Sequence, residues 1–190
     1  MGRPATDKRQ RLVAAAIEQF HLKGVRGTSL AEVARAAGIP AGNVFYYFRT
    51  KDDLVGAVTD EWCSLLSGYL RELGGDDPIR RIEGFIEQAC VLGDMYVALG
   101  CPLAGLTRDL RQEGGSLAAE AGRIYSVQFS WLESQFAASG YSHAETRAHA
   151  RFLMARYHGA ILLAHAQGDR GLIKTEVESL KLWLNGLQRG

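Results

Sequence analysis

The side chains best suited to recognition chemistry lie close together near the middle of the first 55 residues. Asn43 can pair with the edge of adenine, and Tyr46 and Tyr47 carry hydroxyls that can reach phosphate oxygens. Lys51 follows at the expected start of a helix, where the helix dipole disfavours a cation unless an anion faces it. This combination of amide, phenol and ammonium groups indicates contacts with nucleic acid.

The segment from residue 28 to residue 54 predicts two short helices around a glycine turn, followed by the start of a longer helix. Thr28 or Ser29 can cap the first helix, because a side-chain oxygen there accepts a hydrogen bond from a free backbone N–H. Gly38 can end that helix in the left-handed conformation, and Pro40 can open the next one. Two helices joined in this way are typical of the helix-turn-helix, whose second helix enters the DNA major groove.

The second of these helices is predicted to run from about Pro40 to Phe48. Its first residues are small, so its backbone can approach a partner closely. We expect Val44, Phe45 and Phe48 to point inward as anchors. The residues expected to contact DNA are Arg26, Thr28, Ser29, Ala41, Asn43, Tyr46, Tyr47 and Lys51.

The pattern A-x-x-A-G-I-x-x-G-x-V-F-Y-Y-F-x-T-K-D-D-L, which ends at Leu54, resembles the DNA-binding signature of TetR-type transcriptional regulators. The resemblance reaches back to Arg9. Phe45 departs mildly from the signature, since it stands where the family most often has Tyr. Tyr47 matches a position where the family commonly has His or Tyr.

This resemblance implies an all-α fold with an N-terminal helix-turn-helix DNA-binding domain over residues 1–51 and a helical effector-binding and dimerisation domain over residues 52–190. It also implies a ligand-responsive transcriptional regulator, expected to be a repressor, that binds a palindromic operator as a dimer and is released by a small molecule. The implied partners are double-stranded DNA, an unknown small-molecule effector and a second copy of the chain.

The charge distribution fits such a division. Residues 1–51 carry nine basic and three acidic side chains, a net charge of +6, and the remainder therefore carries −5 in a chain of net charge +1. A basic segment attached to an acidic one is typical of a domain that binds a polyanion. Arg3, near the N-terminus, can reach along the DNA backbone or into the minor groove, although a tag-like end is an equal alternative.

The composition also indicates the cellular compartment of the protein. The sequence contains no run of about 18 uncharged apolar residues and begins with a charged stretch unlike a signal peptide. Cys63, Cys90 and Cys101 are odd in number and cannot all pair, which fits a reducing compartment. We therefore expect a soluble cytoplasmic protein without membrane contacts.

Apolar residues recur with helical spacing through the rest of the chain. Beyond the helix-turn-helix, the predicted helices cover about residues 7–23, 51–73, 78–92, 94–99, 102–110, 116–139, 142–167 and 172–187. The last two are apolar enough to need a second covering surface. In TetR-like proteins such helices form a four-helix interface with a twofold mate, although packing within one subunit can use part of this surface.

Aromatic side chains with polar tips can line an apolar effector pocket, although most such residues in a helical body belong to the core. The residues expected there are Trp62, Tyr69, Phe85, Tyr96, Cys101, Tyr125, Phe129 and Tyr157. Cys101 immediately precedes Pro102, a position where a helix N-terminus favours the thiolate. The segment G-C-P-L-A-G-L-x-x-D-L is also similar to one in a TetR subgroup that includes repressors of electrophile and acrylate metabolism, some with a reactive sensor cysteine. A merely packed cysteine is the alternative.

The sequence contains no nucleophile elbow, phosphate-binding glycine loop or paired carboxylates, so we predict no catalytic residues and no cofactor. His158 and His165 share a helix face, but Asp169 falls in the following loop, and we predict no metal site. Two other functional classes stay open. One is an all-α enzyme that binds a small apolar substrate, and the other is a helical interaction module without DNA binding.

Overall fold

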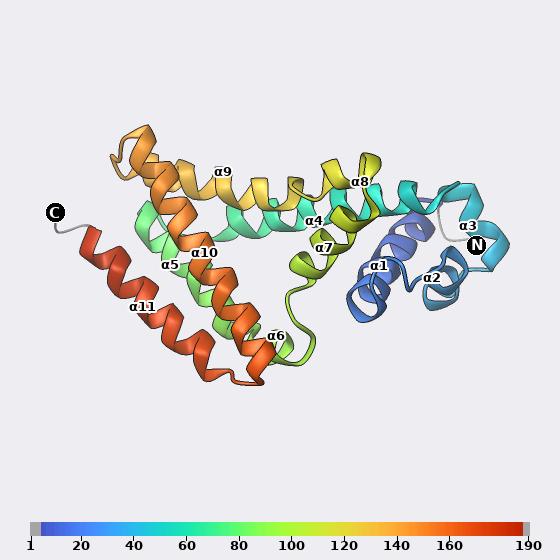
Figure 1. Ribbon diagram of the computed structural model, residues 1–190. Helices are drawn as coiled ribbons and strands as arrows, with labels where there is room; N and C mark the ends of the chain where they lie inside the picture. Colours follow the sequence, from blue (N-terminus) through green and yellow to red (C-terminus); the bar gives the residue numbers. More distant parts are fainter. Residues whose placement is uncertain (1–4, 188–190) are drawn as a thin grey trace. The chain divides into compact units, whose positions relative to one another are not determined.

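The structure is a computed structural model of the 190-residue chain, and it describes residues 5–187 (Figure 1). All regular secondary structure in this range is helical, which confirms the predicted all-α fold. The helices are α1 (Ala5–Lys23), α2 (Leu30–Ala36), α3 (Ala41–Tyr47), α4 (Lys51–Glu72), α5 (Pro78–Val91), α6 (Gly93–Leu99), α7 (Pro102–Glu113), α8 (Gly115–Glu120), α9 (Arg123–Ala138), α10 (His143–Gln167) and α11 (Gly171–Leu187).

Packing divides the chain into two compact units. The first comprises Met1–Leu65 and Pro102–Ile124, and the second comprises Leu66–Cys101 and Tyr125–Gly190. α7 and α8 therefore belong to the same unit as α1, α2 and α3. The functional boundary expected between residues 51 and 52 does not coincide with this division of the packing, and it stays a prediction.

Local hydrogen bonds explain where α2 begins and ends. The Ser29 hydroxyl accepts a bond from the N–H of Glu32 at 3.2 Å, and the Glu32 carboxylate accepts one from the N–H of Ser29 at 2.8 Å. Gly38 has a φ of 63°, a left-handed conformation that glycine adopts without strain. The guanidinium of Arg11 donates to the carbonyl of Ala37 and so satisfies the end of the helix. The predicted cap at Ser29 and turn at Gly38 are confirmed, whereas Pro40 is the N-cap of the next helix, which begins at Ala41.

One predicted helix is wrong in extent. The single helix expected over residues 116–139 is divided into α8 and α9, because the chain turns at Ala121 and Gly122. Glycine is a poor helix former, so the low helix propensity of Gly122 favours a break at this point. α7 continues to Glu113, three residues past its predicted end.

The core of the second unit lies among α5, α9, α10 and α11 (Figure 1). α10 and α11 pack side by side, and α5 packs against α11. Along α10, Leu153, Tyr157 and Ile161 are buried at intervals of four residues, whereas Leu162 and Leu163 are exposed. Part of the apolar surface of α10 is therefore left exposed within one chain, and its covering by a second copy stays a prediction.

Within residues 5–187, no helix by itself has the length and apolar composition needed to span a membrane. α5 and the segment Gly93–Glu113 meet these criteria only as a bent pair. Cys63, Cys90 and Cys101 form no disulfide.

Candidate DNA-binding surface and effector-binding region

α3 is held in the first unit by two apolar side chains. Val44 is buried within the helix, and Phe48, the extended residue that follows its last turn, is buried as well. Phe45 was expected beside them, but its side chain is 57% exposed, so that prediction is wrong. The physical reason is that each residue turns the helix by about 100°, which carries the residue after Val44 away from the buried side.

The exposed side of α3 consists of the predicted contact residues together with Phe45. Tyr46 is 82% exposed, and its ring meets that of the half-buried Tyr47 edge-on at 5.1 Å between centroids. Ala41 and Asn43 are also exposed. A Cβ atom added to Gly42 would meet nothing within 4 Å, so the backbone here is open to a partner.

Two of the predicted DNA contacts are engaged by the protein itself. Thr28 is only 2% exposed, and its hydroxyl donates to the carbonyl of Gly24 at 2.9 Å. This burial corrects the expectation that the Thr28 side chain faces DNA. Arg26 is exposed, but its Nε lies 2.7 Å from Oε1 of Glu113 and its Nη2 donates to the carbonyl of Gln112 at 3.2 Å.

The remaining predicted contacts outside α3, Ser29 and Lys51, lie at the start of α2 and the start of α4. Ser29 is exposed, but its hydroxyl also donates to the carboxylate of Glu32 at 2.8 Å. These bonds from the N–H and hydroxyl of Ser29 lower the pKa of Glu32 to about 2. At α4, the carboxylate of Asp53 accepts a bond from the N–H of Thr50 at 2.9 Å, and this bond lowers the pKa of Asp53. Lys51 is half-buried in the same first turn.

Arg3, which was expected to reach along the DNA, lies outside the described residues.

The structure brings three of the expected effector residues together. Phe85, Tyr96 and Tyr157 are buried in the core of the second unit, and the rings of Phe85 and Tyr157 stack with centroids 4.9 Å apart. Tyr69, Cys101, Tyr125 and Phe129 pack against the same core. Trp62 belongs to the first unit and is not part of this core.

The phenols of this group are held neutral. Burial is the main cause that raises the pKa of Tyr69 to about 12, and burial also raises the pKa values of Tyr96, Tyr125 and Tyr157 well above their usual range. The nearby Cys101 contributes to the rise at the last three. A tyrosine hydroxyl is uncharged at neutral pH, and these raised pKa values keep the four hydroxyls uncharged at alkaline pH as well.

Sequence reasoning missed His158 as a member of this group. Its ring meets those of Tyr125 and Tyr157 edge-on at 5.0 and 5.1 Å, and its Nε2 lies 3.3 Å from Oε1 of Gln128. Burial lowers the pKa of His158 to about 4. Because the ring is neutral and Gln128 offers an acceptor, Nε2 donates and Nδ1 is left as an acceptor with no partner among the described residues. No local sequence signal distinguishes this histidine from the others.

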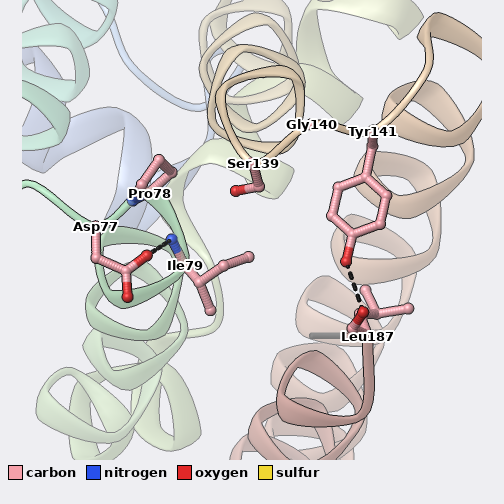
Figure 2. Close-up of a pocket in the computed structure, with 7 residues that line it drawn as sticks. All are labelled: Asp77, Pro78, Ile79, Ser139, Gly140, Tyr141 and Leu187. Atoms are coloured by element: carbon pink, nitrogen blue, oxygen red, sulfur yellow. Dashed lines mark hydrogen bonds between the residues drawn. The ribbon is translucent and has the colours of Figure 1, made fainter. Parts of the chain in front are cut away.

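The second unit also contains a cavity of about 450 Å³. It is lined by Asp77, Pro78, Ile79, Ser139, Gly140, Tyr141 and Leu187, none of which was expected to bind an effector (Figure 2). Two of its polar side chains make hydrogen bonds within the protein: Tyr141 donates to the carbonyl of Leu187 at 3.0 Å, and Asp77 accepts from the N–H of Ile79 at 2.9 Å (Figure 2). We assign it no ligand.

A smaller hollow of about 280 Å³ lies between α10 and α11. It is lined by Arg156, Gly159, Ala160, Leu163, Leu172, Thr175 and Glu176. Arg156 spans its edge, because its guanidinium pairs with the carboxylate of Glu176 and lies over the ring of Phe152. The result is an apolar groove with a polar margin on the outer face of the last two helices.

No group of three or more His, Cys, Asp or Glu side chains within residues 5–187 is arranged to hold a metal ion. His165 donates from Nδ1 to the carbonyl of Val97 at 2.9 Å, so one of its nitrogens is committed to the backbone.

Comparisons with known proteins agree with the predicted helix-turn-helix. Residues 12–58 match the family described as bacterial regulatory proteins, tetR family. The HTH-type transcriptional regulator LmrA of Bacillus subtilis (strain 168) is 24% identical over 166 residues, which cover 83% of this chain and 86% of that protein. The HTH-type transcriptional repressor Rv3405c of Mycobacterium tuberculosis is 39% identical over 89 residues, which cover 42% of this chain and 47% of that repressor.

Solved structures show the same fold. The reduced form of Escherichia coli NemR has a TM-score of 0.83 at 20% identity, with 92% of this chain and 95% of that chain covered. A TetR transcriptional regulator from Legionella pneumophila has a TM-score of 0.78 at 20% identity, with 98% and 99% covered. At these identities the likeness establishes the fold alone.

Proposed function

We propose that this chain, which belongs to the TetR family of bacterial transcriptional regulators, is a repressor that binds a palindromic operator as a homodimer and releases it when a small molecule binds. Its relatives are named as regulators, and the chain is a DNA-binding protein and not an enzyme. The observation that carries the proposal is the arrangement of side chains on α3. Asn43 and Tyr46, which are suited to contact bases and phosphates, are exposed, whereas Val44 on the opposite side is buried and holds the helix in the first unit.

In this proposal α3 lies in the major groove, where its exposed side chains meet base edges. Ala41, Asn43 and Tyr46 contact bases, and Tyr47 and Lys51 contact phosphates. The net charge of +6 over residues 1–51 supports the phosphate contacts, because each neutralised phosphate releases bound counterions. Arg26 and Thr28 are left out of this set, since their polar groups are engaged within the protein.

The groove between α10 and α11 supports the homodimer. The groove is shallow at the small residues Gly159 and Ala160, and the exposed side chain of Leu163 lies beside them. In a twofold dimer, Leu163 of one copy can therefore pack into the groove of the other copy. Leu163→Glu should therefore convert the dimer to a monomer in sedimentation experiments. Val91→Glu, at a residue that is 72% exposed on α5, is the matched control and should leave the dimer intact.

The neutral phenols and His158 support an uncharged effector that combines an apolar body with hydrogen-bonding groups. Such a ligand can shift the protein only by binding one of two states more tightly than the other. α4 is one continuous helix from Lys51 to Glu72, and we take it as the lever that connects the effector region to α3. The effector would favour the state in which the two α3 helices cannot span both half-sites.

Cys101 suggests a more specific form of this proposal, in which the effector is an electrophile that modifies the Cys101 thiol. Cys101 is half-buried and packs with Tyr96 and Tyr125 in the second unit. N-ethylmaleimide should then release operator from the wild-type protein but not from Cys101→Ser. Cys63 and Cys90 stay in the variant and serve as internal controls, so an equal response of both proteins would contradict a sensing role.

The main test is the selection of bound sequences from a random duplex pool, followed by a salt titration of the enriched sequence. The proposal expects an enriched palindrome and a steep salt dependence. The double variant Tyr47→Ala/Lys51→Ala should lose operator binding and keep wild-type helicity and dimerisation. Retained affinity in that variant would overturn the assignment of α3 and α4, and the failure of both proteins to enrich any sequence would overturn the function.

A further inference from the structure

Phe45 is a largely exposed apolar side chain that is not part of the buried core. Its neighbours Val44 and Phe48 fill the buried positions that hold α3, whereas Phe45 is 57% exposed. A phenyl ring has no donor for a phosphate oxygen, so Phe45 cannot replace the polar contacts of Tyr46 or Tyr47. If α3 lies in the major groove, the exposed ring of Phe45 can contact an apolar group of a base there.

The helical spacing of α3 determines which side chains lie beside Phe45 on the exposed side of the helix. With about 100° per residue, Gly42 and Tyr46 lie opposite the buried Val44. Phe45 and Ala41, four residues apart, form one flank of this exposed strip. The other flank, which starts with Asn43, is polar. α3 therefore presents an apolar side and an amide-bearing side to the groove, with the open backbone of Gly42 between them.

An A·T pair displays the same two features in the major groove. Adenine offers N6 and N7 to an amide, and thymine offers its 5-methyl group to an apolar side chain such as Ala or Phe. We propose that Phe45 contacts the 5-methyl group of a thymine in each operator half-site and so specifies thymine at that position. This inference rests on the proposed function, because it requires α3 to lie in the major groove.

The expected effect follows from the methyl group alone. Burial of one methyl-sized group changes an equilibrium by about 4-fold. A symmetric operator contains two such contacts, so removal of both methyl groups should weaken binding by roughly 15-fold. Deoxyuridine removes the methyl group of thymidine and leaves the hydrogen-bonding pattern of the base pair unchanged.

The test is a double-mutant cycle on the selected operator. Symmetric thymine pairs are replaced by uracil one pair at a time, and the dissociation constants are measured at fixed salt for wild-type protein and for Phe45→Ala. The wild type should lose roughly 15-fold at one thymine pair, and Phe45→Ala should bind the thymine and uracil duplexes equally. Phe45→Tyr keeps the ring and should keep the preference for thymine.

A matched control separates this contact from general apolar effects. Leu22 is also an exposed apolar residue of the first unit, 60% exposed on α1, and Leu22→Ala should retain the full thymine preference. Circular dichroism checks that each variant is folded. Equal binding of both duplexes by the wild type, or a thymine preference that survives in Phe45→Ala, overturns the proposal. The failure of wild-type protein to bind any selected duplex overturns the proposed function instead, so the two failures are distinct.

Discussion

The carboxylate of Asp109 in α7 accepts a hydrogen bond of 2.7 Å from the main-chain N–H of Val25, at the end of α1. Both residues are buried within the first unit. The fit is close, because a Cβ on Gly24, whose φ is 75°, would lie 2.8 Å from the same carboxylate oxygen. One side chain thus joins α7 to the turn that precedes α2, although the two positions lie far apart in the sequence.

Replacement of Asp109 should destabilise the protein strongly. Asp109→Ala leaves the buried N–H of Val25 without an acceptor, and we expect the free energy of unfolding in urea to fall by about 1–3 kcal/mol. Arg108→Ala is the control, because Arg108 pairs with the same carboxylate at 2.9 Å but is largely exposed. Its loss should cost less than about 1 kcal/mol. Equal effects of the two changes would show that the bond to Val25 contributes little.

The cap of α2 should be visible in the titration of Glu32. Its pKa is lowered to about 2 mainly by hydrogen bonds from Ser29, so the stabilising interaction is present above the usual pKa of a glutamate and is lost as pH falls toward 2. Ser29→Ala removes the hydroxyl and should raise this pKa, as measured by NMR of the carboxyl carbon. Glu145, capped separately by Ser142 on α10, should titrate as in the wild type.

The salt dependence of operator binding should separate Lys51 from Arg26. If Lys51 neutralises a phosphate in each subunit, Lys51→Ala should reduce the slope of log K against log salt by about 1.8 for the dimer. Arg26→Ala should reduce the slope much less, because its guanidinium is paired with Glu113 at 2.7 Å. A larger reduction for Arg26→Ala than for Lys51→Ala would show that DNA breaks this ion pair.

His158 should make the free energy of unfolding depend on pH in the mildly acidic range. Burial lowers its pKa from 6.5 to about 4, so as pH falls the unfolded chain takes up a proton before the folded protein does. The associated loss of stability between pH 6.5 and 4 should be on the order of 2 kcal/mol. His158→Gln cannot titrate, and its urea-unfolding free energy should fall less over this range. Parallel pH profiles for the two proteins would contradict this assignment.

Local features of the fold were predictable because their causes lie within a few residues. The cap at Ser29 and the left-handed turn at Gly38 each depend on neighbouring backbone groups, and apolar spacing predicted almost every helix. The division between α8 and α9 was missed, since a single glycine such as Gly122 lowers helix propensity without forcing a break.

The site was predictable in part. The sequence determined an all-helical fold with a basic N-terminal segment, because helical period, caps and charge are properties of the chain itself, and the resemblance of residues 34–54 to the TetR-type signature implied DNA binding. Tertiary structure alone decided that Thr28 is buried, that Phe45 is exposed and that Asp109 reaches Val25. Which side of a helix is covered, and which distant group satisfies a buried N–H, depends on packing between segments that no local pattern records.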